Sequence, residues 1–156
     1  MSVANAWLFP LGGKHWAAVG AHQMVHLVYE PQLTPIPLTP PHCSHALLLE
    51  GHILPVWDIA VWLGAALPRR ATHLAAVVAY AGSDGRQLGA IQLGAIQLVG
   101  PPVRATVSDE AACPLPETPA RWKSIAISCF RHGDHVVPVV DVAHMFSDAC
   151  AARRVP

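Results

Sequence analysis

The chain contains the stretch His52-Ile53-Leu54-Pro55-Val56-Trp57-Asp58-Ile59-Ala60-Val61-Trp62-Leu63, and a related stretch begins again at His135. The second copy reads His135-Val136-Val137-Pro138-Val139-Val140-Asp141-Val142-Ala143-His144-Met145-Phe146, and its His, Pro, Val, Asp and Ala repeat those of the first. Each copy begins with β-branched and aromatic residues that favour a buried strand. Each then reaches an Asp that can cap a short helix. A repeat at long spacing is typical of a duplicated structural unit, so we expect two related halves.

Size and composition predict a folded domain. The chain has 156 residues, of which 53% are hydrophobic and 13% charged, so core material is ample and disorder is not expected. Halves of this length would be marginal alone, and we expect them to share a core. The expected organisation is a single domain, residues 1–156, with one subdomain at about 1–68, a second at about 69–148, and a short C-terminal tail.

Charge and hydropathy exclude several classes of function. Ten Lys+Arg balance ten Asp+Glu, without the basic run that neutralises phosphates in a nucleic-acid-binding protein. No signal peptide is evident, and no uninterrupted apolar stretch is long enough for a membrane helix, so no direct membrane insertion is expected. The cysteines, Cys43, Cys113, Cys129 and Cys150, form no CxxC pair, which indicates reduced thiols in a cytoplasmic protein.

Short apolar runs separated by turn residues predict a mainly β fold. Gly12-Gly13-Lys14 joins two strand-like runs, Glu50-Gly51-His52 joins two more, and Gly133-Asp134 follows a run over 124–130. Five prolines lie between Pro31 and Pro41, which excludes an ordinary helix there. The five-residue repeat from Gln87 fits neither strand nor helix periodicity and leaves the register of 87–100 open. The pattern indicates a β-barrel or a sandwich.

With these motifs placed, the chain resembles the CheW-like family of chemotaxis coupling proteins. The residues that carry the resemblance are Leu33-Thr34-Pro35-Ile36-Pro37, Thr39-Pro40, the run from Leu47 to Ile59, and the closing run Val136 to Val142. The resemblance implies two intertwined five-stranded barrel subdomains, SH3-like or OB-like, with short helices. It also implies a scaffold without catalysis or a cofactor, which bridges the cytoplasmic hairpin of a chemoreceptor and the regulatory domain of a CheA-like histidine kinase.

By the same resemblance, the partner-binding groove between the subdomains would take Met24, His26, Glu50, Ile53 and Val56. Several polar positions of the family differ here, because a Glu is replaced by His26 and the Arg before Gly51 is replaced by Glu50. In the family these two positions lie on neighbouring strands. If the two strands are adjacent here too, the polarity of the pair is reversed. Two explanations stay open: drift at two exposed positions, or a change in partner choice, in which case the partner should carry a basic residue at this contact.

Metal and enzyme functions have less support in the sequence than this interpretation. His42-x-x-His45, His22-x-x-x-His26 and His132-x-x-His135 could supply zinc ligands, but outside a helix this spacing does not aim two rings at one point. No activated nucleophile or phosphate loop is present, and the matching contexts of Asp58 and Asp141 favour helix caps over a pair of catalytic carboxylates. The leading hypothesis is a non-enzymatic chemosensory adaptor. The alternative is a small metal- or ligand-binding regulatory domain that kept the fold and lost the array role.

Overall fold

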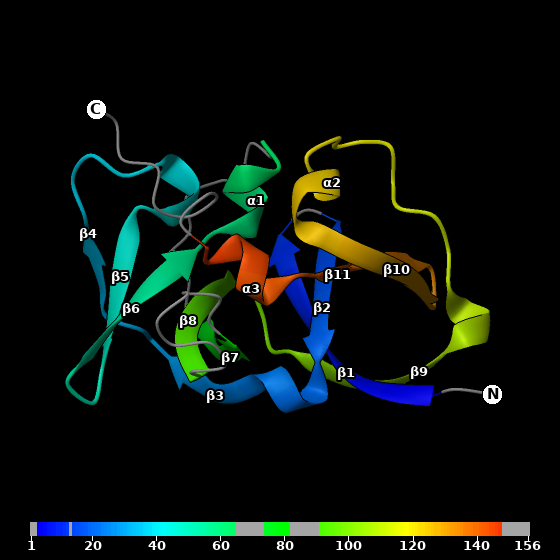
Figure 1. Cartoon of the computed structure of the whole chain (residues 1–156), viewed down its shortest axis with the longest axis horizontal. Coiled ribbons are helices and arrows are strands. Elements are labelled where there is room, and N and C mark those ends of the chain that lie inside the picture. The colour runs from blue at the N-terminus through cyan, green and yellow to red at the C-terminus, as the bar shows by residue number, and fades with distance from the viewer. Residues whose placement is uncertain (1–2, 13, 65–73, 82–90, 148–156) are drawn as a thin grey trace.

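In the computed structural model the described residues are 3–12, 14–64, 74–81 and 91–147. The fold is mainly β, as predicted, and consists of two curled sheets with short helices (Figure 1). Within the described residues, no helix is both long and apolar enough to cross a membrane.

The first sheet has five strands, in the order β10-β11-β2-β1-β9. Their bounds are β1 (Val3–Gly12), β2 (His15–Gly20), β9 (Val103–Ser108), β10 (Ala126–His132) and β11 (His135–Val140). The predicted hairpin around Gly12 is confirmed, because β1 pairs antiparallel with β2 from Ala6 opposite Gly20 to Gly12 opposite His15.

The second sheet has six strands, in the order β3-β7-β8-β6-β5-β4. Their bounds are β3 (Met24–Tyr29), β4 (Leu33–Pro35), β5 (His45–Leu49), β6 (His52–Trp57), β7 (Leu74–Ala81) and β8 (Ile91–Leu98). Five strands were expected, and the sixth is β4, which the first part of the proline-rich segment adds to the edge of β5. Proline is tolerated at such an edge because its missing N–H faces away from the ladder.

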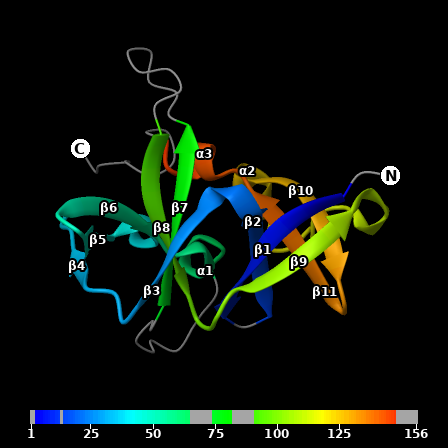
Figure 2. The same cartoon turned by 90° about the horizontal axis from the view of Figure 1, so that it is seen from below.

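Each sheet takes strands from both halves of the chain. The β1–β2 hairpin pairs with β9 on one side and, in parallel, with β11 on the other. The β7–β8 hairpin likewise pairs with β3 and, in parallel, with β6. The expected boundary between subdomains near residue 68 lies outside the described residues. Each sheet contains strands from both sides of that boundary. Figure 2 shows the two sheets at opposite ends of the molecule.

The helices are all short. They are α1 (Ile59–Trp62), α2 (Trp122–Ile125) and α3 (Val142–Met145), with single 3₁₀ turns at η1 (Ala21–Gln23), η2 (Pro41–Cys43) and η3 (Asp109–Ala111). The run predicted as a strand from Ser124 is helical up to Ile125, because Trp122 and Ile125 both turn into the core.

The repeated phrase folds the same way twice. Asp58 follows β6 and accepts a hydrogen bond from the backbone N–H of Val61 at 3.2 Å, at the start of α1. Asp141 follows β11 and accepts from His144 N–H at 3.1 Å, at the start of α3. The prediction of two strand–cap–helix units is therefore confirmed.

One large core joins the two sheets. Its buried side chains include Phe9 and Val140 from the five-stranded sheet and Trp57 and Ile96 from the six-stranded sheet. Each sheet also has a small cluster of its own. Because the large cluster takes side chains from both sheets, neither sheet can lose its partner without exposing buried apolar surface.

Candidate partner-binding surface

The β5–β6 hairpin turns at Glu50-Gly51, and this turn fixes what the hairpin exposes. Glu50 has a φ of 49° and Gly51 a φ of 81°. Two positive φ values in a two-residue loop define the type of turn that matches the natural twist of paired strands. The turn sets Leu49 opposite His52 and Leu48 opposite Ile53.

Leu48 and Ile53 form an exposed apolar pair on this hairpin. Their side chains are 55% and 74% exposed, whereas the neighbouring pair, Leu47 and Leu54, is buried in the core of the six-stranded sheet. Cross-strand partners lie close enough to act as one contact surface. We call Leu48, Glu50 and Ile53 the hairpin patch. Leu48 was not among the expected site residues, although the two-residue turn already sets position 48 opposite position 53.

Val56 does not belong to this surface. It is 2% exposed and packs in the core of the six-stranded sheet with Ala75 and Ala95. Its backbone pairs with His45 on one side and Ala95 on the other. A partner that docks on the hairpin cannot reach its side chain, so Val56 supports the surface from beneath.

Met24 and His26 lie on β3, at the other end of the same sheet. The register against β7 shifts between them, with Met24 opposite Val78 and His26 opposite Val77. Such a bulge re-aims the side chains around it. His26 and Val25 are exposed, whereas Met24 is partly buried against the large core. We call Val25 and His26 the β3 patch.

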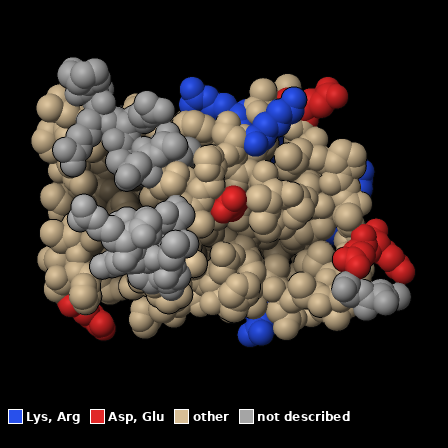
Figure 3. Space-filling model, viewed as in Figure 1, with Lys and Arg blue, Asp and Glu red and all other residues tan. Residues whose placement is uncertain are grey.

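The structure does not join the two patches through neighbouring strands. Three strands, β7, β8 and β6, separate β3 from β5 in the sheet order. The condition for a reversed pair is therefore not met, because His26 and Glu50 do not lie on adjacent strands and do not form a cross-strand pair. Expected site residues thus fall into two patches, which three strands separate in the sheet order. Charged side chains are scattered over the face in Figure 3, most of which is uncharged.

His42 and His45, two of the candidate metal ligands, contact aromatic rings and a hydroxyl group instead. The His42 ring is buried and lies 4.4 Å from the Trp57 ring and 4.7 Å from the Trp62 ring, between ring centroids. His45 shares a hydrogen bond of 3.0 Å with the Ser44 hydroxyl. Across the part of the chain that the structure describes, no three His, Cys, Asp or Glu side chains are grouped to hold a metal ion.

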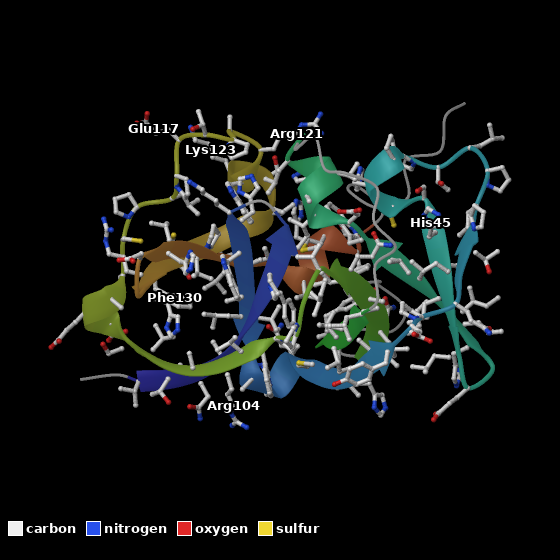
Figure 4. All side chains as sticks on the ribbon, turned by 180° about the vertical axis from the view of Figure 1, so that it is seen from behind. His45, Arg104, Glu117, Arg121, Lys123 and Phe130 are labelled. Carbon is white, nitrogen blue, oxygen red and sulfur yellow. The ribbon has the colours of Figure 1, made fainter. Side chains whose placement is uncertain are left out.

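Trp62 ties the two halves of the chain together. Its indole N–H donates to the backbone carbonyl of Arg121 at 3.2 Å, and the Arg121 guanidinium donates to the Trp62 carbonyl at 3.1 Å. The guanidinium carbon lies 4.6 Å from the centre of the indole ring, a cation–π distance. Figure 4 shows Arg121 where α2 meets α1. Trp57, in contrast, is fully buried.

A cavity of about 500 Å³ opens beside the five-stranded sheet, which the sequence did not predict. Lys14 lines it from the turn before β2, and His15 and Trp16 line it from the start of β2. Asp134 lines it from the turn before β11, and His135 lines it from the start of β11. Trp122 of α2 completes the wall, with its ring 6.4 Å from that of His15. The cavity lining combines ionisable and aromatic side chains.

Comparison with known proteins identifies the fold and the family. No curated protein matches the chain. Among solved structures, the scaffolding protein TtCheW from Thermoanaerobacter tengcongensis superposes with a TM-score of 0.71 at 14% sequence identity, covering 94% of this chain and 94% of that one. The family model for the CheW-like domain matches residues 5–150. The chain is therefore a member of the CheW-like domain family.

Proposed function

We propose that this protein is a non-enzymatic, cytoplasmic adaptor that couples chemoreceptors to a CheA-type histidine kinase. The observation that carries the proposal is membership of the CheW-like family over nearly the whole chain. The structurally similar TtCheW is itself described as a scaffolding protein.

Two exposed patches on different strands suit a protein that contacts other proteins. The hairpin patch offers apolar side chains, of which Ile53 is 74% exposed, and the β3 patch offers the edge of the same sheet. An isolated pair of exposed apolar residues on a hairpin suits a small, reversible contact of less than about 1,200 Å².

Calorimetric titration of the protein with a kinase regulatory domain, and separately with a receptor hairpin, tests the proposal. Ile53→Glu should weaken binding of one partner at least about tenfold, because a central apolar contact contributes about 1.4 kcal/mol or more. Ile127→Glu is the matched control, since Ile127 is 66% exposed but lies on β10 of the other sheet. No binding of either partner by the wild type would refute the adaptor function.

The cavity favours one rival function, a ligand-binding regulatory domain. Its ionisable lining could hold a small polar molecule without any contact to a kinase. Metal analysis and native mass spectrometry of the purified protein separate the two functions. A stoichiometric metal or ligand, together with no binding of the kinase domain, would favour the rival.

A further inference from the structure

Cys113 and Cys129 lie directly opposite each other on two antiparallel segments. Ala112 and Phe130 form an antiparallel bridge, and the backbone N–H of Cys113 donates to the carbonyl of Cys129 at 3.0 Å. Their two sulfur atoms are 3.5 Å apart. Residues opposed in this way have Cα atoms about 4.5–5.5 Å apart, within the roughly 4.4–6.8 Å that a disulfide spans. The two sulfurs can therefore bond with little movement of the backbone.

The two thiols differ in their access to solvent. Cys129 is 4% exposed, whereas Cys113 is only partly buried. Burial, together with the hydrogen bond that it shares with the Cys113 thiol, raises the pKa of Cys129 to about 12. Because the thiolate is the nucleophile, the thiol that meets an oxidant first is Cys113, and Cys129 reacts second.

We propose that Cys113 and Cys129 form an oxidation site that a hydroperoxide converts into a disulfide. The Cys113 thiol gives up its proton and attacks one oxygen of the peroxide as a thiolate. The O–O bond breaks, a sulfenic acid forms, and the other oxygen takes up the released proton and leaves as an alcohol or, from hydrogen peroxide, as water. The Cys129 sulfur then attacks the Cys113 sulfur, the S–O bond breaks, and the hydroxyl group leaves as water with the Cys129 proton. Two thiols are oxidised and one peroxide is reduced.

The disulfide would link the segment between η3 and α2, which lines part of the cavity, covalently to β10 of the five-stranded sheet. Cys113 begins the segment that leads from η3 to α2, and this segment carries Pro116 and Thr118, which line the cavity. Figure 1 shows the segment leaving η3 beside β10. Oxidation would anchor its first residues to β10 covalently. The site is independent of the proposed adaptor function, since neither cysteine belongs to the hairpin patch or the β3 patch.

Tryptic mapping of the folded protein after exposure to hydrogen peroxide tests this inference directly. Cleavage after Lys and Arg places Cys113 in peptide 105–121 and Cys129 in peptide 124–131, while Cys43 and Cys150 fall in other peptides. The proposal predicts one linked species of 105–121 with 124–131, lighter by two hydrogen atoms than the two peptides combined. Absence of this species, while other cysteines are oxidised, would overturn the proposal.

Two variants and one control fix the order of events. In Cys129→Ser, the sulfenic acid should accumulate on Cys113 and react with dimedone, whereas Cys113→Ser should give no dimedone adduct on Cys129. The same peroxide treatment in urea is the control, because unfolding removes the alignment of the two thiols. Linkage that is equally fast in urea, or an adduct on Cys129, would contradict the site as proposed.

Discussion

The two capping aspartates make the same hydrogen bond in different surroundings. Burial raises the pKa of Asp58, and the N–H groups of Val61 and Ala60, together with the charge of His45, only partly oppose this shift. The ionised carboxylate of Asp58 is therefore less stable in the folded protein than in the unfolded chain. Asp58 therefore makes the capping hydrogen bond to α1, but its burial disfavours the charged carboxylate that makes it.

Removing either cap should destabilise the fold by a similar amount. Asp58→Ala and Asp141→Ala should each lower the free energy of unfolding by about 1 kcal/mol, because each leaves a helix N–H without its acceptor. Urea denaturation at neutral pH measures the change. A much smaller decrease in the free energy of unfolding in both variants would mean that water accepts the helix N–H hydrogen bond as well as the aspartate does.

The raised pKa of Asp58 predicts a pH dependence that Asp58→Asn removes. A group with a raised folded pKa stabilises the fold fully below its unfolded pKa of about 3.9, and that stabilisation is lost as pH rises through the folded value. Asparagine keeps the cap and does not titrate. Urea denaturation from pH 3 to pH 7 should therefore show the variant gaining stability relative to the wild type as pH rises. A difference that stays constant over this range would contradict the shift.

Among the elements, strand β8 requires glycine at one position of the five-residue repeat. The second copy of the repeat places Gly94 in β8, opposite Val78. A Cβ atom built at Gly94 would lie 2.6 Å from ring carbons of Phe146, so only glycine fits beneath this ring. Phe146 in turn stacks on Tyr80, with ring centroids 5.4 Å apart.

Gly94→Ala should destabilise the protein by about 1–3 kcal/mol, because the added methyl group overpacks a filled core. Gly100→Ala is the matched control, since its Cβ would meet only Pro10 at 3.5 Å, an ordinary contact. Thermal denaturation of both variants measures the difference. Equal melting temperatures would show that Phe146 moves aside freely.

The sequence predicted those elements whose formation depends on neighbouring residues alone. The strand–Asp–helix phrase and the Gly12 and Gly51 turns carry their own signals, and the structure confirms them. The need for glycine at position 94 depends on Phe146, which is distant in sequence, so no local pattern revealed it. Position 56 could have been excluded from the surface, because residues 53 and 56 face opposite sides of a regular strand.

The pairing of strands across the two halves is a property of the whole molecule. Two similar halves offer similar apolar strands, so pairing within a half and pairing between halves satisfy the same sequence pattern. The resemblance to the CheW-like family implied the intertwining, whereas composition and periodicity did not. The same limit applies to His26 and Glu50, whose separation depends on the sheet order.

The intertwined sheets predict that half of the chain cannot fold alone. Residues 1–68 contain β1 and β2 without β9 or β11, and β3 without β7. This fragment should show no cooperative thermal transition, whereas mixing it with residues 69–156 should restore one. A transition of the fragment 1–68 alone, near that of the whole chain, would show that the halves are independent.

Bridging is the central claim for the whole molecule, and one pull-down measures it. A kinase regulatory domain is immobilised, and retention of a soluble receptor hairpin is recorded with and without this protein. The account predicts that the hairpin is retained only when the protein is present, and that Ile53→Glu reduces retention while Ile127→Glu does not. Retention that is the same with and without the protein would contradict the adaptor function.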